Sequence, residues 1–474
     1  MQFNKTTAAE RALTIPDLRS MISLYVETED ALNCMLVNKE WNKDFTYPVW
    51  HTIDFYTHPD FDALDQDVIQ RNGHNIRRIK NLKEMTHLNA LECAKISRLS
   101  SLSMWISEDQ YLQSQLYQFL RENNAHTVQV SLMREIDPNR YSKPVDLVPV
   151  DAILPSVRNG STGPSKLTYI MIYGLNMTFQ SLSILLRNCP ELQTLHLWGT
   201  RFLDDGQPYE EYAHPGVTCL FASLRDLVNL DSATDKTHTI FDLFPNVETF
   251  MMRELSMPST EHSLRFIKAV IASSWPRLTS VEFTSTPDFV IVECLDNIFE
   301  NLTRITLEYA EMGPITMDAI MRNREVLTSL RSYLPATEYY EYPYFEEIYD
   351  PLAGMTWLMQ MIPSQCPKLE VFNFPLHTMK FVEMQWSLWV CKDLRELKIR
   401  IHGLDTAEKI DSTLWIWKQV QKLRLRGVLV PRSHKNAIVP WGHDWLFESQ
   451  VARFLLEFTK LRTVWLGTSI ITLE

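Results

Sequence analysis

The chain has 474 residues, of which 45% are hydrophobic and 22% are charged, so it has enough apolar material for a large core. Its formal net charge of -12 argues against nucleic acid or an anionic membrane as the main partner, although a local basic patch is still compatible with it. The low count of 13 glycines argues against folds that need many glycine-rich cofactor loops. The seven cysteines include no Cys-x-x-Cys pair, which argues against a disulfide scaffold and a zinc module and indicates a reducing compartment.

Residues 1–12, MQFNKTTAAERA, form a polar tail without the apolar segment of a secretory signal. Further along the chain, the longest uncharged stretch, residues 351–367, is interrupted by glutamine and proline, so we predict no membrane span. We therefore expect a soluble protein of the cytoplasm, the nucleus or both, with no membrane partner.

Residues 13–55 have the apolar spacing of a compact helical module. Pro16 is placed to be the first residue of a helix, and Asp30 is placed to cap the next one. The apolar and aromatic positions of the module are Leu18, Ile22, Leu32, Met35, Leu36, Val37, Trp41, Phe45 and Trp50. About forty residues bury little core, so such a module gains stability from an apolar partner or from the chain that follows it.

The order of these residues resembles an F-box. The resemblance is carried by Ile15-Pro16-Asp17-Leu18, Ile22, Leu32, Leu36-Val37-Asn38-Lys39-Glu40-Trp41 and Trp50. It implies three helices that dock on the Skp-type adaptor of SCF ubiquitin ligases. The adaptor-binding residues that it implies are Ile15, Pro16, Leu18, Ile22, Leu32, Val37, Trp41 and Trp50. Met21 and Val26 depart from the family pattern, and the alternative interpretation is a helical cap on the end of a repeat array.

The rest of the chain, residues 56–474, contains an internal repeat: an apolar residue followed by further apolar residues at +3 and +5. Clear copies, each preceded by an aromatic residue or cysteine and a proline, are Leu192/Leu195/Leu197, Val247/Phe250/Met252, Leu278/Val281/Phe283 and Leu369/Phe372/Phe374. Side chains two apart in a strand point the same way, so the +3 and +5 positions predict one short strand. Helical stripes such as Leu182, Leu185 and Leu186 end just before the proline.

Copies of the repeat mostly begin 23 to 32 residues apart, which is the period of leucine-rich repeats with irregular insertions. The sequence therefore predicts an α/β fold: the helical module followed by a horseshoe-shaped solenoid with parallel strands on its concave face and helices on its convex face. Leu224/Leu227 is assigned as a degenerate copy.

Two spacings are too long for one repeat, and each must hold either a degenerate repeat or a projecting loop. These insertions lie near residues 308–360 and 427–450. The first contains an acidic, tyrosine-rich segment, residues 338–350. Its aromatic residues are candidates for substrate binding, and packing of the loop on its own repeat is the alternative. The candidates are Tyr339, Tyr340, Tyr342, Tyr344 and Phe345.

Motifs for nucleotide, zinc or acyl chemistry are missing, so we expect no catalytic residue, cofactor or metal. Cys189, Cys366 and Cys391 occupy repeat junctions, where cysteine acts as a small hydrophobic residue. The basic run 71–80 contains Ile76 and Ile79 at strand-like positions, which favours a strand with solvated polar side chains over a phosphate site.

The F-box resemblance and the repeats together imply a substrate-recognition subunit of an SCF-type E3 ubiquitin ligase. In this interpretation the chain is not an enzyme: it docks on a Skp-type adaptor, and through it a cullin, while the repeats hold a target protein that the sequence does not name. One alternative is a ligase-independent interaction scaffold. Another is a small-molecule co-receptor, which requires a deep polar pocket on the concave face.

Overall fold

The computed structural model describes residues 13–23, 25–26, 28–134, 147–154, 164–203, 212–222, 243–253, 275–284, 286, 288–297, 301–308, 314–333, 356–380, 389–402, 422–426, 463–466 and 469–472. The chain divides into two compact units, Met1–Val217 and Thr218–Glu474. Within the described ranges, no helix has the length and apolar content that crossing a bilayer requires.

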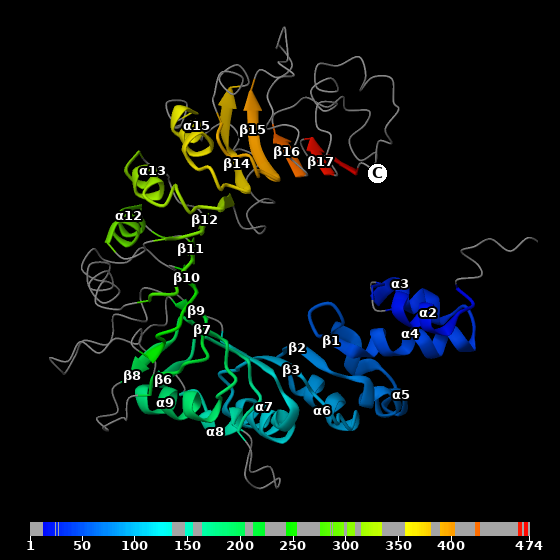
Figure 1. Ribbon diagram of the computed structural model, residues 1–474. Helices are drawn as coiled ribbons and strands as arrows, with labels where there is room; N and C mark the ends of the chain where they lie inside the picture. Colours follow the sequence, from blue (N-terminus) through cyan, green and yellow to red (C-terminus); the bar gives the residue numbers. More distant parts are fainter. Residues whose placement is uncertain are drawn as a thin grey trace, which may run out of the picture. The chain divides into compact units, whose positions relative to one another are not determined.

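The first unit opens with three helices: α2 (Pro16–Ser23), α3 (Thr28–Met35) and α4 (Lys39–His51) (Figure 1). Pro16 is the first residue of α2, as its fixed φ predicts. The prediction that Asp30 caps the next helix is wrong: α3 begins at Thr28, so Asp30 lies inside its first turn. Strand β1 (Thr52–Asp54) follows α4 directly.

The remaining chain of this unit alternates strands with helices. The strands that pair in sequence are β1, β2 (Arg78–Leu82), β3 (Ser101–Trp105), β4 (Gln129–Met133), β5 (Tyr169–Tyr173) and β7 (Thr194–Trp198), each parallel to the next. Tyr169 pairs with Thr194, so these neighbours in the sheet are one repeat apart in the chain. This is the strand arrangement of a solenoid of the leucine-rich-repeat type.

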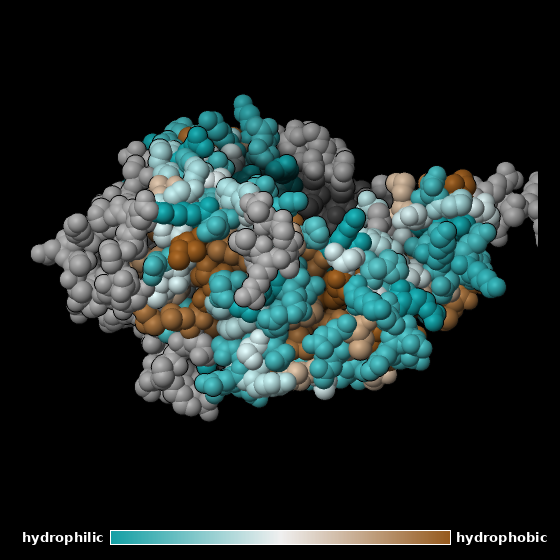
Figure 2. Space-filling model, turned by 90° about the horizontal axis from the view of Figure 1, so that it is seen from below, coloured by the Kyte–Doolittle hydropathy of each residue, from teal (hydrophilic) through white to brown (hydrophobic). Residues whose placement is uncertain are grey.

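The helices of the first unit lie together on one side of these strands (Figure 1). They are α5 (Gln66–Asn72), α6 (Met85–Cys93), α7 (Gln110–Asn123), α8 (Val150–Ile153) and α9 (Phe179–Asn188), with 3-10 turns η1 (Pro59–Ala63), η2 (Gly73–Asn75) and η3 (Asn124–His126). Consecutive helices contact one another, and a short pair, β6 (Asn176–Thr178) and β8 (Arg201–Leu203), runs parallel beside them. Seen from the helix side, the surface is mostly hydrophilic with hydrophobic patches between (Figure 2).

The core lies between strands and helices and is built from the repeat positions. The +3 and +5 residues are buried in the complete copies whose side chains the structure describes, as Leu195 and Leu197 of β7 show, and the turn residue Leu192 is buried with them. The residues between them, such as His196, are half-buried on the opposite side of the strand. Each strand therefore has one face in the core and one open face.

The second unit repeats the same construction. Its parallel strands are β9 (Cys219–Ala222), β10 (Thr249–Arg253), β11 (Ser280–Thr284), β12 (Arg304–Glu308), β13 (Ser329–Tyr333), β14 (Val371–Lys380), β15 (Glu396–His402), β16 (Lys422–Arg426) and β17 (Thr463–Leu466). Strand β18 (Ser469–Thr472) is antiparallel to β17. Its helices are α12 (Asp288–Asn297), α13 (Pro314–Met321) and α15 (Thr356–Gln365).

Among the parallel strands that the sequence pattern does not identify as repeat copies are β4, β9 and β13. Each departs from the pattern at one position, with Thr127 just before β4, Ala222 in β9 and Ser332 in β13 where the pattern requires a larger apolar side chain. The long spacing near residues 308–360 therefore holds a degenerate repeat, α13 with β13. Residues 334–355, the insertion 427–450 and the copy assigned to Leu224/Leu227 lie outside the described residues.

Candidate functional site

The three N-terminal helices carry large apolar side chains on their surface. The exposed fractions are 46% for Ile15, 37% for Leu18, 58% for Met21, 39% for Ile22, 47% for Leu32, 84% for Leu36 and 58% for Val37. We call these seven residues the module face. Single exposed apolar residues are ordinary, but this many on so small a unit are typical of a surface that binds another protein.

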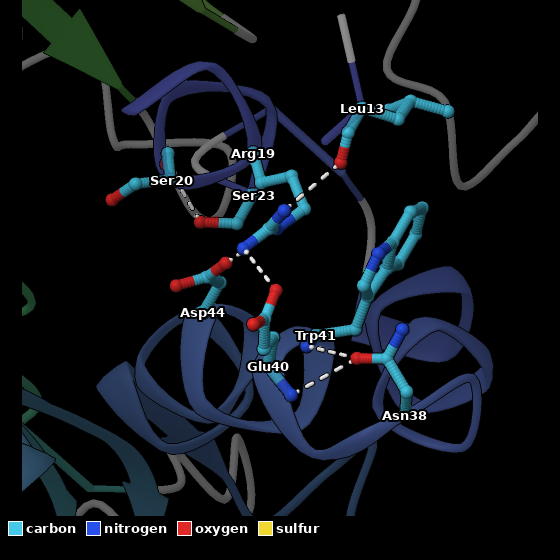
Figure 3. Close-up of polar contacts among 8 residues, drawn as sticks. All are labelled: Leu13, Arg19, Ser20, Ser23, Asn38, Glu40, Trp41 and Asp44. Atoms are coloured by element: carbon cyan, nitrogen blue, oxygen red, sulfur yellow. Dashed lines mark hydrogen bonds and ion pairs between the residues drawn. The ribbon is translucent and has the colours of Figure 1, made fainter. Parts of the chain in front are cut away.

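A buried arginine explains why α2 turns its apolar side outward. Arg19 is 3% exposed, and its Nε donates a hydrogen bond to Oδ2 of Asp44 at 2.7 Å (Figure 3). Its other nitrogens donate to Oε2 of Glu40 at 3.3 Å and to the carbonyl oxygen of Leu13 at 3.0 Å. The inner side of α2 is thus fixed to α4 by charge, which leaves Leu18 on the surface.

The start of α4 is fixed by its cap. Asn38 is extended, and its Oδ1 accepts hydrogen bonds from the backbone N–H of Glu40 at 2.9 Å and of Trp41 at 3.0 Å (Figure 3). Asn42 Nδ2 donates to the carbonyl oxygen of Met35 at 3.3 Å, which joins the end of α3 to the first turn of α4. These bonds set the loop that presents two exposed members of the module face, Leu36 and Val37.

The structure places most of the predicted adaptor-binding residues at the surface. Those that are exposed are Ile15, Pro16, Leu18, Ile22, Leu32 and Val37. Trp41 is half-buried, with its ring stacked on Phe45 at 5.4 Å between centroids. Pattern reasoning had not selected Met21 and Leu36 for this surface, because apolar spacing alone does not show which side of a short helix faces the core.

Trp50 differs from the exposed members of the predicted set. It was expected at the adaptor interface, but only 7% of it is exposed, and its ring packs edge-on against Phe61 at 6.0 Å. Phe61 also meets Phe55 edge-on at 5.6 Å, and Phe55 stacks on His87 at 4.0 Å. Trp50 therefore joins the helical module to the first coil of the solenoid instead of lying at the surface.

The candidate substrate-binding residues Tyr339, Tyr340, Tyr342, Tyr344 and Phe345 lie outside the described residues. The structure shows a different aromatic surface that pattern reasoning missed, on the open face of the strands of the first unit. It includes Trp105, Tyr173 and Trp198, which follow one another across the sheet through the paired register. The signal was present in the sequence, because these residues alternate with the buried repeat positions.

The described residues include no group of three or more His, Cys, Asp or Glu side chains arranged to hold a metal. Burial raises the pKa of Cys189 to about 11 and the pKa values of Cys366 and Cys391 to about 12. These three thiols are therefore protonated at neutral pH and lie in the core, as predicted for cysteines at the repeat junctions.

No protein-family model and no curated protein matches the chain. Among solved structures it is similar to one titled "Crystal structure of TLR13-ssRNA13 complex", with 12% identity and a TM-score of 0.35. The alignment covers 83% of this chain and 51% of that one, so the chain spans about half the length of that protein. A TM-score of this size does not establish a common fold, and the RNA belongs to that complex. The class of this chain, an α/β solenoid of the leucine-rich-repeat type, follows from its own strand order and register.

Proposed function

We propose that the chain is a substrate-recognition subunit of an SCF-type E3 ubiquitin ligase. The N-terminal helices dock on a Skp-type adaptor, and the repeats hold the target protein. The single observation that supports this most directly is exposure: six of the eight residues assigned to the adaptor by the F-box resemblance are exposed, and all of them except Pro16 belong to the module face. The chain performs no chemistry in this role, and it raises the effective concentration of the target near the ligase.

The module face has the chemistry of a protein-docking surface. Burying one Leu or Ile side chain contributes about 1.5–3 kcal/mol, so a few of them at the centre of an interface suffice for stable binding. Leu32 and Val37 are well exposed: Leu32 lies within α3, and Val37 lies in the segment that links α3 to α4. Removing either from an interface, or replacing it with a charge, is therefore expected to weaken adaptor binding strongly.

The test is co-purification of the full chain with a Skp-type adaptor. Leu32→Asp places a charge in the module face, and Asn33→Asp places the same charge on the adjacent exposed position of the same helix. We expect Leu32→Asp to weaken adaptor binding at least tenfold and Asn33→Asp to change it by less than threefold, with both variants unfolding at the wild-type temperature. Absence of adaptor binding by the wild-type chain, or equal binding by both variants, would contradict the proposal.

A second candidate is a ligase-independent scaffold in which the helical module only caps the solenoid. The packing of Trp50 on Phe61 supports a capping role, because it covers the apolar end of the first coil. Capping uses the inner side of the module and docking uses its outer side, so the two roles are compatible. Only the docking role predicts an effect of Leu32→Asp on a partner.

A further inference from the structure

The open face of four neighbouring strands in the first unit carries no charge. The strands are β3, β4, β5 and β7, and their outward residues are Ser101, Ser103, Trp105, Gln129, Ser131, Met133, Tyr169, Met171, Tyr173, Thr194, His196 and Trp198. We call this set the neutral face. All are half-buried except Gln129, which is exposed, and none is Asp, Glu, Lys or Arg.

The register arranges these residues in rows across the sheet. One row is Trp105, Met133, Tyr173 and Trp198, and the next is Ser103, Ser131, Met171 and His196. The rings of Tyr173 and Trp198 meet edge-on with centroids 5.8 Å apart, and those of Tyr169 and His196 are 4.9 Å apart. Aromatic rings and methionine thereby form a continuous apolar strip with serine hydroxyls beside it.

The first ring of the strip is held by a polar chain from the two preceding strands. Trp105 Nε1 donates a hydrogen bond to Oδ1 of Asn81 at 3.2 Å, and Nδ2 of Asn81 donates to Oδ1 of Asp54 at 2.7 Å. Asn81 has a left-handed φ of 58° at an irregularity in the pairing of β2 with β3. The indole N–H is thus satisfied within the chain, and the ring is fixed in place for an apolar ligand.

Positive charge begins at the strand next to the neutral face. Arg78 and Lys80 are exposed on the outward side of β2, and neither has an ion-pair partner among the described residues. At the end of β4, by contrast, Arg134 is paired with Glu108 at 3.7 Å. Burial lowers the pKa of His196 to about 4, so this ring is also neutral at pH 7. The uncharged strip is therefore bordered by cations on β2, where Arg78 is in register with Ser101 and Lys80 lies opposite Asp54 of β1.

This charge distribution decides between classes of ligand. A single-stranded nucleic acid stacked on these rings would need cations along its whole length to meet the phosphates, and the neutral face supplies none. Extended proline-rich peptides, by contrast, bind to surfaces lined with aromatic rings. The row from β3 to β7 crosses three strand spacings, about 14 Å, which matches four to five residues of polyproline II at about 3.1 Å per residue.

We propose that the neutral face binds an extended segment of a partner protein that is rich in proline and leucine and has acidic residues at the end lying over β2. The role of this partner as a ligase target rests on the proposed function, whereas the binding itself rests only on the face. The aromatic row contacts the apolar side chains, the serine hydroxyls bond the peptide backbone, and Arg78 and Lys80 pair with the acidic end.

The test is the binding of fluorescent synthetic peptides to the full chain, followed by anisotropy. The probe is Glu-Glu-Pro-Leu-Pro-Pro-Leu-Pro, and the comparison peptides replace Glu-Glu with Lys-Lys or each Leu with Ser. We expect the probe to bind at least tenfold more tightly than either. Tyr173→Ala and Met133→Lys should each weaken binding at least tenfold, while Tyr111→Ala, an exposed tyrosine on α7, should leave it unchanged.

Charge reversal on β2 tests the predicted contact with the acidic end of the peptide directly. In the double variant Arg78→Glu with Lys80→Glu, the preference should invert, so that the Lys-Lys peptide binds better than the Glu-Glu peptide. The proposal is overturned if the probe fails to bind, if Tyr173→Ala binds it normally while folded, or if an RNA oligonucleotide binds in its place. Adaptor co-purification of Tyr173→Ala is expected to stay at the wild-type level, so failure here is distinguishable from failure of the proposed function.

Discussion

Arg19 shows how one side chain determines what a small helical unit presents to solvent. It occupies the inner side of α2, where an apolar residue is usual, and its partners Asp44 and Glu40 both come from α4. Only Asp44 is well covered, because the side chain of Glu40 is 77% exposed. The pair with Asp44 therefore has the greater energetic weight, and the pair with Glu40 contributes little.

Replacing Arg19 with methionine should destabilise the helical module by about 3 kcal/mol, because it leaves the covered carboxylate of Asp44 without its cation. Thermal unfolding and limited proteolysis within residues 13–51 measure the change. Lys43→Met, on the exposed side of α4, is the matched control and should have an effect below about 0.5 kcal/mol. Equal protease resistance of the Arg19→Met variant and the wild type would show that the ion pair does not hold α2 in place.

A buried histidine makes the first unit sensitive to acid. Nδ1 of His214 accepts hydrogen bonds from the N–H groups of Gly216 at 3.1 Å and Val217 at 3.2 Å, so it must be unprotonated, while Nε2 lies 2.9 Å from the carbonyl oxygen of Cys189. Burial lowers its pKa. Because the folded pKa lies below the unfolded value of about 6.5, the stabilisation is complete above that pH and is lost as the pH falls through the folded pKa.

We therefore expect the free energy of unfolding of the first unit to decrease when the pH is lowered from 7 to 5. His214→Gln should be less stable at pH 7, because it disturbs these hydrogen bonds, but should show a shallower pH dependence. Chemical denaturation at several pH values measures both quantities. An unchanged slope in the variant would assign the acid sensitivity to other histidines, of which His196 also has a lowered pKa.

Among the elements, β13 shows how far a repeat can depart from its pattern. Leu327 and Leu330 are fully buried, but Ser332 takes the place of the third apolar residue, opposite Leu307 in the register. The strand nevertheless pairs in parallel with β12 on one side and β14 on the other. Two buried leucines and two neighbouring strands are therefore enough to hold this repeat in the solenoid, because the backbone of β13 is hydrogen-bonded to a strand on each side.

Because the two leucines supply the burial, we expect substitutions in β13 to lower stability most at those positions. Leu330→Ala should cost about 2–5 kcal/mol through lost burial and the cavity left behind, whereas Ser329→Ala, at the half-buried adjacent position, should cost less than about 1 kcal/mol. Denaturant unfolding of the full chain provides the measurement. A similar loss of unfolding free energy in the two variants would mean that this repeat is held by the backbone pairing of β13 alone.

The same elements show what the sequence does and does not reveal. The +3 and +5 spacing predicts strands such as β7 because both positions are large and apolar. It misses β4, where the polar Thr127 occupies the turn position of the copy, and β9, where the small Ala222 is the +5 residue. In the module, residue order predicts the apolar positions and assigns Trp50 to the adaptor interface, since nothing local shows that Phe61 packs against it.

At the scale of the molecule, the first unit presents two surfaces of different chemistry. The module face is apolar and helical, and the neutral face is aromatic and lies on parallel strands. They share no residue, so a variant of either leaves the other intact. The second unit has a more charged open face, where Arg331 and Lys398 both approach Glu396, at 3.7 and 3.0 Å. The proline-rich partner is therefore assigned to the first unit.

Deleting residues 1–51 separates docking from capping. The deletion removes Trp50, and it also removes the carbonyl oxygen of His51 that accepts a hydrogen bond from the backbone N–H of Arg77 at 3.0 Å. It exposes Phe55 and Phe61 and leaves β1 as an uncovered edge, which is a site for aggregation. We expect the truncated chain to unfold at a lower temperature and to self-associate, as seen by light scattering.

The Leu32→Asp variant, by contrast, should lose adaptor binding and keep the wild-type unfolding temperature. A truncated chain that is monomeric and equally stable would show that the module serves only to bind its partner, because the first coil would then need no cover.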